Sequence, residues 1–134
     1  MSIFASPRFL RNVLLADAVS CVATGAIQVL FTAPLAGLLH VPAALLSGAG
    51  WFLLAYAAAV AFIGTRDPLP RPLIWLVVVG NLGWAVACGA LLASNAIAPG
   101  NLGVAWILAQ AATVAVLAEL QWTALRRTRI SGWA

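Results

Sequence analysis

Residues 43–65 read AALLSGAGWFLLAYAAAVAFIGT, a run of 23 residues without a charged side chain. An α-helix rises about 1.5 Å per residue, so about 20 such residues cross the hydrocarbon core of a bilayer. Three more stretches of the same character, roughly 9–32, 72–94 and 103–125, lie on either side of this run. The sequence therefore predicts an all-α membrane protein with four transmembrane helices.

The composition of the chain also favours a membrane location over a soluble one. Of the 134 residues, 64% are hydrophobic and 7% are charged, whereas about a quarter of the residues in a soluble domain are charged. A soluble chain of this length cannot bury so much apolar surface, because its ratio of surface to volume is too high. A bilayer covers the outer faces instead, and we expect residues 1–134 to form a single transmembrane domain.

The connections between the predicted spans are short. The first covers about 33–42, after a span that we expect to stop at Pro34, the second covers 65–72, and the third covers about 95–101. Helices that follow one another through short connections pack as antiparallel neighbours. The predicted architecture is therefore an up-down antiparallel four-helix bundle.

The arginines are distributed unevenly between the two ends of the predicted spans. All seven lie in the N-terminal segment, the second connection or the C-terminal segment, namely Arg8, Arg11, Arg66, Arg71, Arg126, Arg127 and Arg129. The first and third connections contain none, and the chain has no lysine. By the positive-inside rule, both termini are expected in the cytoplasm and the protein in the bacterial cytoplasmic (inner) membrane. This distribution predicts membrane lipid as a partner and argues against nucleic acid, which requires a basic stripe.

Polar residues within the spans form stripes at the helical period. A polar group in lipid is expensive, so such stripes are expected to face protein, water or a ligand. On the first span the stripe covers about 120° of arc and contains Asp17, Ser20, Cys21, Thr24, Gln28 and Thr32. The residues predicted to form a polar interior, or a proton or ligand site, are Asp17, Ser20, Thr24, Gln28, Asn81, Trp84 and Gln110.

The fourth span has two polar faces. One contains Trp106, Gln110, Thr113 and Gln121, and the opposite one contains Glu119, Thr123, Arg126, Ala105, Ala112 and Ala115. Only one of these faces can enter a four-helix bundle. We therefore predict that Glu119 and Arg126 mark a second acidic site or an interface, covered by a second copy of the chain or by another membrane protein. Small residues such as Ala112 allow the close approach that helix association in lipid requires.

The two acids within the spans, Asp17 and Glu119, allow two interpretations. Each carboxylate could pair with an arginine near the cytoplasmic end, the candidates being Arg8, Arg11, Arg71 and Arg126. Alternatively, the polar stripe that continues from Asp17 could line a cavity, a binding groove or a proton path.

Several kinds of chemistry lack the residues that they need. His40 is the one histidine, so one chain cannot supply a bis-histidine haem site or a histidine-rich metal site. No Ser-His-acid set can form inside the bundle, and no glycine-rich phosphate motif is present. We therefore expect no catalytic residues, no metal and no cofactor, and we favour a non-enzymatic role unless chemistry rests on Asp17 or Glu119 alone.

A pattern along the whole chain resembles one group of proteins. It consists of Leu10-Arg11, Leu15-Ala16-Asp17-Ala18, Asn81, Trp84, Gln110, Glu119-Leu120-Gln121 and Leu125-Arg126-Arg127. In these features the chain resembles small uncharacterised four-helix integral membrane proteins of bacteria. It is also weakly similar to small multidrug-resistance transporters, which have about four spans and one acid in the first. That resemblance gives Asp17 the role of the acid, but those transporters use a glutamate and their motifs around it are missing here.

These observations leave three functional hypotheses. The first is a non-enzymatic integral inner-membrane protein with a polar bundle interior that self-associates or serves as an accessory subunit. The second is a small proton-coupled transporter that uses Asp17. The third is a lipid- or quinone-binding module with a cavity framed by Asp17, Gln28, Asn81 and Trp84.

Overall fold

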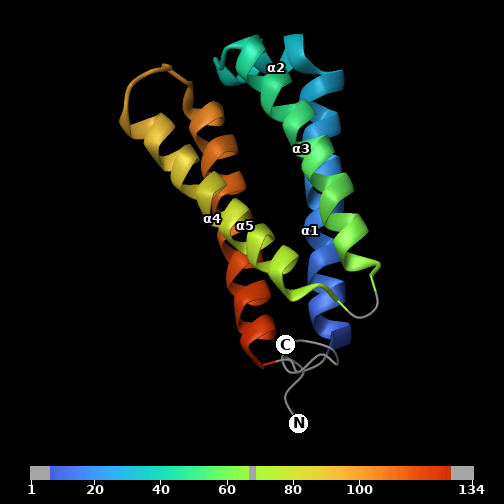
Figure 1. The fold of residues 1–134 in the computed structure, drawn as a ribbon. Coiled ribbons are helices and arrows are strands. Elements are labelled where there is room, and N and C mark those ends of the chain that lie inside the picture. Colours follow the sequence, from blue (N-terminus) through green and yellow to red (C-terminus); the bar gives the residue numbers. More distant parts are fainter. Residues whose placement is uncertain (1–6, 67–68, 128–134) are drawn as a thin grey trace.

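The computed structural model describes residues 7–66 and 69–127, and within these ranges the chain is helical with no strand. Four long helices are α1 (Pro7–Leu30), α3 (Ala43–Gly64), α4 (Arg71–Ala93) and α5 (Asn101–Arg127). Each is long and apolar enough to cross a membrane. Their ends lie within two residues of the predicted spans, so the all-α class and the four long apolar helices are confirmed (Figure 1).

A fifth, short helix occupies the first connection, where the sequence indicated none. Backbone dihedrals at Phe31 (φ −118°, ψ 33°) interrupt the first helical run, and α2 then covers Thr32–Leu39. The expectation that the first run stops at Pro34 was wrong, because this proline lies in the first turn of α2. A proline is tolerated there since the first N–H groups of a helix have no partner within the helix. The helix ends at His40, which has left-handed backbone dihedrals (φ 55°).

The long helices pack as two pairs. Helix α1 lies along α3, and α4 lies along α5 (Figure 1). Between the pairs, α1 contacts α5 less than the helices within a pair contact each other, and α3 and α4 have few contacts. The pairs lie close together where α1 begins and α5 ends, and α4 diverges from α3 toward the other end (Figure 1).

Glycines allow the backbones of α1 and α3 to approach closely. A Cβ atom added at Gly25 would lie 2.8 Å from the carbonyl oxygen of Gly50, and one added at Gly50 would lie 3.0 Å from that of Gly25. In lipid, where no hydrophobic effect drives association, such close approach supplies the van der Waals contact that holds helices together. The α1/α3 pair is therefore held by direct backbone contact between the second half of α1 and the first half of α3.

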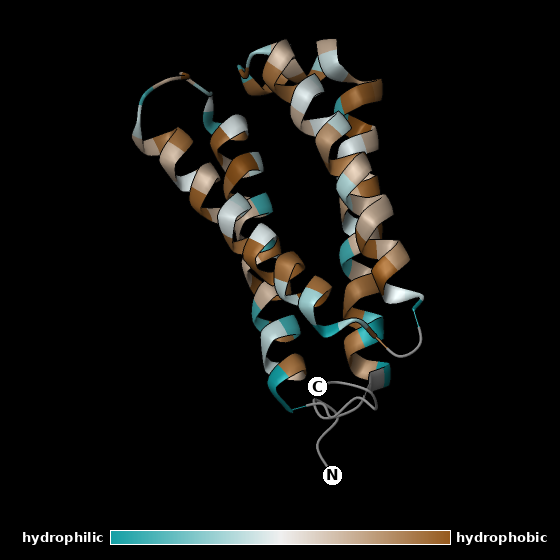
Figure 2. Ribbon diagram, in the orientation of Figure 1, coloured by the Kyte–Doolittle hydropathy of each residue, from teal (hydrophilic) through white to brown (hydrophobic). Residues whose placement is uncertain are grey.

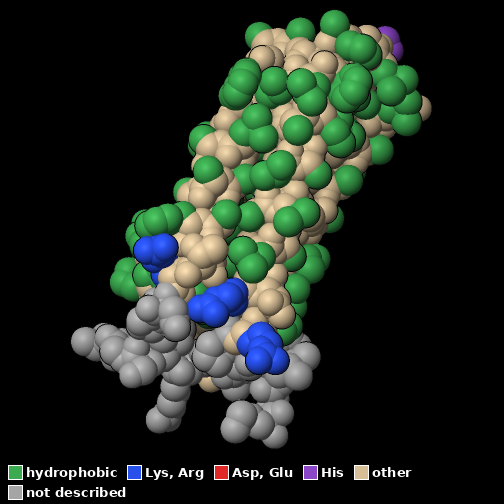
Figure 3. All heavy atoms as spheres, turned by 90° about the vertical axis from the view of Figure 1, so that its right-hand side faces the viewer, with side chains coloured by type: hydrophobic (Ala, Val, Ile, Leu, Met, Phe, Trp, Pro, Cys, Tyr) green, Lys and Arg blue, Asp and Glu red, His purple; other side chains and the backbone are tan. Residues whose placement is uncertain are grey.

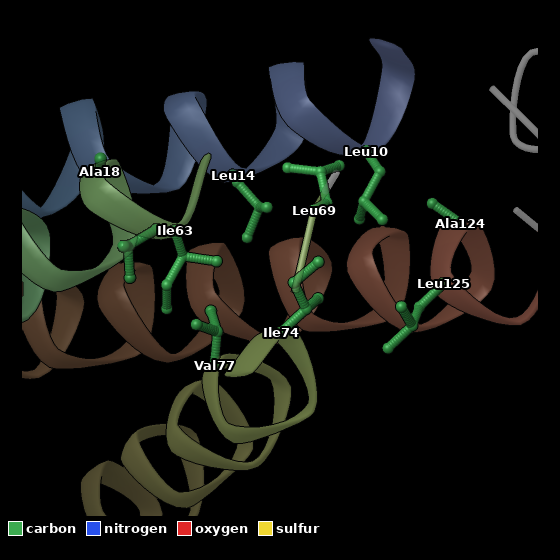
Figure 4. Packing of buried hydrophobic residues seen from close by; sticks show 10 residues of the cluster. Leu10, Leu14, Ala18, Ile63, Leu69, Ile74, Val77, Ala124 and Leu125 are labelled. Carbon is green, nitrogen blue, oxygen red and sulfur yellow. The ribbon is translucent and has the colours of Figure 1, made fainter. Parts of the chain in front are cut away.

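The main hydrophobic cluster joins the two pairs at the end where they converge. Its buried members come from α1, α3, α4, α5 and the α3–α4 connection, and they include Leu10, Leu14, Ile63, Leu69, Ile74 and Leu125 (Figure 4). Hydrophobic residues occur along the whole length of the same helices (Figure 2). Val19, Leu30, Leu76 and Val86 are each more than 60% exposed. An apolar surface of this extent suits contact with lipid better than contact with water.

The described arginines lie at the end of the molecule where α1 begins, α3 meets α4 and α5 ends. In the face shown in Figure 3 the basic side chains gather at this end, and His40 lies at the opposite one. Arg11 donates hydrogen bonds of 3.0 Å to the carbonyl oxygens of Gly64 and Arg66, at the C-terminus of α3. A cation at this position also interacts favourably with the helix dipole.

Candidate functional site

A buried carboxylate lies between the two helix pairs. Asp17 on α1 has no exposed surface. Its Oδ2 atom accepts a hydrogen bond of 2.7 Å from Nδ2 of Asn81 on α4 and one of 2.8 Å from Nε2 of Gln121 on α5. Asn81 Nδ2 also donates to Gln121 Oε1 at 3.1 Å. The three side chains therefore form a closed triangle of hydrogen bonds that joins α1, α4 and α5.

Two further side chains extend this triangle. The Tyr56 hydroxyl on α3 lies 2.9 Å from the carbonyl oxygen of Val77 and 3.2 Å from Asn81 Oδ1, so it can donate to either oxygen. The Cys21 thiol, one turn along α1, donates to Asp17 Oδ1 at 3.5 Å. Side chains from all four long helices thus meet in one group, which we call the Asp17 cluster: Asp17, Cys21, Tyr56, Asn81 and Gln121.

Hydrogen-bond donors surround Asp17 where one of the two interpretations of the sequence placed an arginine. An ionised carboxylate can only accept hydrogen bonds, and each of its three contacts comes from a donor. Hydrogen bonds to a charged group are about twice as strong as neutral ones. Among the described residues no arginine contacts Asp17, and Arg11 binds backbone carbonyls instead. The interpretation of Asp17 as the partner of an arginine is therefore wrong, and two amides and a thiol contact its buried carboxyl group instead.

A second polar group surrounds Gln28, nearer the other end of α1. The Gln28 side chain is buried and donates a hydrogen bond of 3.0 Å to the carbonyl oxygen of Leu46 on α3. Its Oε1 atom accepts bonds of 3.0 Å from Trp106 Nε1 and from Gln110 Nε2, both on α5. This amide therefore joins α1, α3 and α5 where α4 has moved away.

A cavity of about 440 Å³ lies where α4 diverges from α3, and we call it the lateral cavity. Most of its lining is apolar and comes from the first half of α3, the last half of α4 and the start of α5. Ala44, Gly48 and Ala87 in this lining are exposed. The cavity is therefore open on the side between α3 and α4, and the amides of Gln28 and Gln110 are the main polar groups on its walls.

A smaller cavity of about 150 Å³, the inner cavity, lies between α1 and α5 and has more polar walls. Ser20, Thr24 and Thr113 line it, together with three residues that also line the lateral cavity: Trp84, Trp106 and Gln110. Asp17 lines neither cavity. Of the seven residues predicted to form a polar interior, Asp17 and Asn81 meet in one cluster, Gln28 and Gln110 meet in another, and Ser20, Thr24 and Trp84 lie on cavity walls.

Trp84 differs from the other polar groups of the interior. Its ring stacks on Phe52 with a centroid separation of 5.6 Å and an interplanar angle of 2°. The indole nitrogen is buried, yet it has no hydrogen-bond partner among residues 7–66 and 69–127. Within these two ranges it is the one buried side-chain nitrogen or oxygen atom without a hydrogen-bond partner.

The predicted second acidic site lies on the outer surface of α5. Glu119 and Arg126 are both exposed, and they line a surface hollow of about 440 Å³ together with Trp122, Thr123 and Arg127. The Arg126 guanidinium lies 5.9 Å from the centre of the Trp122 ring. Neither Glu119 nor Arg126 contacts the Asp17 cluster.

Four residues with a clear part in these groups were not among the predicted site residues: Cys21, Tyr56, Trp106 and Gln121. Cys21 lies on the polar stripe predicted for the first span. Gln121 and Trp106 share the polar face of α5 with Gln110, which was a usable signal. Tyr56 gave no such signal, because its immediate neighbours in α3 are alanines, Ala55 and Ala57. Its role depends on the distance between α3 and α4, which only the tertiary structure provides.

Comparison of the chain with protein-family models, with curated proteins and with solved structures gave no match.

Proposed function

We propose that this chain is a non-enzymatic integral membrane protein of the bacterial inner membrane that binds a lipophilic molecule taken from the bilayer. In this proposal it forms an up-down antiparallel bundle of four transmembrane helices with both termini in the cytoplasm. The observation that carries the proposal is the lateral cavity of about 440 Å³ between α3 and α4. Its volume falls within the range of about 300–1,000 Å³ that is typical of small-molecule sites.

The character of the lateral cavity supports a lipophilic ligand. Its walls are mainly alanine, valine, leucine and isoleucine side chains, with the amides of Gln28 and Gln110 as convergent polar groups. Small-molecule sites are usually apolar pockets in which a few placed polar groups fix the orientation of the ligand. Exposed Gly48 and Ala87 leave the side between α3 and α4 open, which is the route by which a bilayer component would enter.

The contacts of Asp17 favour ligand binding over proton-coupled transport. A transporter that uses this acid needs it to exchange protons with water or with a substrate. Asp17 is fully buried, both of its carboxylate oxygens accept hydrogen bonds, and it lines neither cavity. These observations support a structural role in which the Asp17 cluster holds the two helix pairs together below the cavities.

Photolabelling of the lateral cavity tests the proposal. A long-chain alkane with a diazirine group would be added to the full-length protein in nanodiscs, and the labelled residues would be mapped by mass spectrometry. We expect label on Leu45, Leu91 and Ile107, and at least a threefold loss in Gly48→Leu. The matched control is Gly89→Leu on α4. A Cβ atom added at Gly48 or at Gly89 would have no neighbouring atom within 4 Å, but only Gly48 lines the cavity. Labelling spread evenly over the exposed faces, or insensitive to Gly48→Leu, would contradict the proposal.

A second candidate function is self-association through α5. Ala105, Ala112 and Glu119 are exposed in the single chain, so the bundle's own packing does not cover this face. The small residues on it permit a close helix contact in lipid. We propose that a second copy of the chain packs here, which leaves the lateral cavity on the α3–α4 side unaffected.

A further inference from the structure

Glu119 is an exposed carboxylate on α5, a helix that is long and apolar enough to cross a membrane. It has no hydrogen bond or ion pair within residues 7–66 and 69–127. It lies seven residues before Arg126, which places it about 10 Å further from the arginine-rich end of the helix. A charged side chain at that depth is costly in lipid, and such residues usually pair with another charge. The described part of one chain does not supply the partner.

Arg126 lies on the same side of α5 but does not pair with Glu119 in the single chain. Four exposed residues follow one another at intervals of seven along this side: Ala105, Ala112, Glu119 and Arg126. A straight helix drifts by about 20° in seven residues, so these four lie within about 60° of arc. The Arg126 guanidinium lies 5.9 Å from the centre of the Trp122 ring. The carboxylate and the guanidinium therefore border one surface hollow, of about 440 Å³, without meeting across it.

A second copy of the chain matches this arrangement of charges. Two copies with the proposed topology have the same orientation in the membrane, so two α5 helices that meet run parallel. In a twofold contact the same patch of both copies meets itself, and a seven-residue repeat is the contact line of parallel helices. Glu119 then lies level with the partner's Glu119, and the two Arg126 side chains lie further along. Two carboxylates and two guanidiniums together carry no net charge.

A lipid head group fits the hollow less well than a second copy does. An anionic head group would meet the Glu119 carboxylate in the same hollow as the guanidinium of Arg126. The ammonium group of a zwitterionic phospholipid lies with the head groups, outside the hydrocarbon core. Glu119 lies about 10 Å deeper than Arg126. The guanidinium of a second copy lies near the level of Trp122, which is three residues, or about 4.5 Å, from Glu119 along the helix.

We propose that two copies of the chain pack through α5 and that Glu119 and Arg126 of both copies form one neutral cluster of four charges at the contact. This inference rests on the self-association proposed above as the second candidate function. It adds the charged residues that determine the partner and the parallel, twofold arrangement of the two helices. In surroundings of low dielectric constant the attraction between such charges is stronger than in water. The lateral cavity, between α3 and α4, takes no part in this contact.

Reversal of the charges tests the cluster, because it makes the contact depend on which copies meet. Glu119→Arg gives a copy with two positive charges on this face, and Arg126→Glu gives a copy with two negative charges. Two identical copies of either variant would bring four like charges together. One copy of each variant restores two charges of each sign. Full-length chains with two different affinity tags would be co-expressed, isolated in mild detergent through one tag, and analysed by mass spectrometry for the other.

We expect each single variant to self-associate about tenfold more weakly than wild type, because like charges that face one another across an interface are costly. Co-expressed Glu119→Arg and Arg126→Glu should form a mixed complex at the wild-type level. The double variant Glu119→Arg/Arg126→Glu should self-associate again, since its contact is neutral. Arg66→Glu is the matched control, because it makes the same change of charge at an exposed residue of the same end, outside α5. It should associate as wild type does.

The outcomes separate this inference from the self-association on which it rests. If wild type self-associates but the mixed pair associates no better than either variant alone, the four charges do not meet, and the inference is overturned while self-association stands. The same holds if wild type and both single variants associate equally. If wild type is itself monomeric in mild detergent and in nanodiscs, both are overturned. None of these results bears on the ligand of the lateral cavity.

Discussion

Gln121 on α5 donates a hydrogen bond of 2.8 Å to Oδ2 of Asp17 on α1, across 104 residues of sequence. Asp17 and Gln121 are both fully buried. This contact, with that of Asn81 to the same oxygen, connects the α1/α3 pair to the α4/α5 pair. The Asp17 cluster therefore fixes the relative position of the two helix pairs. The shape of the lateral and inner cavities depends on that position.

The first prediction concerns the charge of Asp17. Asp17→Asn keeps the shape of the side chain but replaces a carboxylate that accepts from three donors with a neutral amide. We expect the free energy of unfolding in mild detergent to fall by about 1–3 kcal/mol, the usual cost of an impaired buried hydrogen-bond network. Asn12→Ala, at an exposed amide of α1 outside the proposed α5 interface, should have no measurable effect. An Asp17→Asn protein of wild-type stability that has lost a measurable pH-driven flux would instead support the transporter hypothesis.

The second prediction concerns the coupling between Asp17 and Gln121. A double-mutant cycle with Asp17→Leu and Gln121→Leu should be non-additive, because either single change leaves the remaining polar group buried with fewer partners. We expect the double variant to be less destabilised than the sum of the single ones by about 0.5–3 kcal/mol. The pair Asp17→Leu and Thr113→Val, whose residues share no contact, serves as the additive reference. Additivity in both cycles would rule out the contact in the folded protein.

The inward position of Asp17 and Asn81 could be predicted from the sequence, but their partners could not. Polar groups in lipid are expected to face protein. The helical period places Asp17 on a polar stripe of the first span and Asn81 on a polar stripe of the third. Which side chains meet depends on how far each helix is rotated about its axis and shifted along it. The sequence pattern does not predict that rotation or shift. For this reason the interpretation of Asp17 as an arginine's partner was wrong: Arg11 donates hydrogen bonds to the carbonyl oxygens of Gly64 and Arg66 at the end of α3 instead.

The short helix α2 and the lack of a hydrogen-bond partner for Trp84 Nε1 among the described residues could not be predicted from the sequence either. Pro34 indicates a helix end, and it becomes compatible with a helix only because the chain breaks at Phe31 and begins a new first turn. Trp84 lies in the middle of an apolar span, where its partner or lack of one depends on three other helices. The four long helices, by contrast, follow from length and composition alone.

The third prediction concerns orientation in the membrane. In a variant that lacks Cys21 and Cys88, single cysteines at Leu38 and Ala98 should react with a membrane-impermeant maleimide added outside intact cells. Both positions are exposed and lie at the end opposite the arginines. A cysteine at Arg66 should react only after the cells are opened, since arginine-rich connections stay in the cytoplasm. Reaction at position 66 from outside would contradict the proposed topology.

The fourth prediction concerns self-association. Ala112→Leu should weaken the oligomer, because a larger side chain prevents close approach of two α5 helices. The mass of the protein in mild detergent should fall toward that of one chain. Ala55→Leu is the matched control, since Ala55 is an exposed alanine on α3 outside this face and outside both cavities. A wild-type protein that is itself monomeric, with no change in Ala112→Leu, would exclude this interface.

If the lateral cavity holds a lipophilic molecule, that molecule should be detected bound to the protein. Native mass spectrometry of the full-length protein released from nanodiscs, with decylubiquinone or monoolein added, measures this occupancy. We predict one bound molecule per chain in wild type and in Gly89→Leu, and no bound molecule in Gly48→Leu, because only Gly48 lines the cavity. No bound molecule in wild type, or equal occupancy in Gly48→Leu and Gly89→Leu, would contradict the claim.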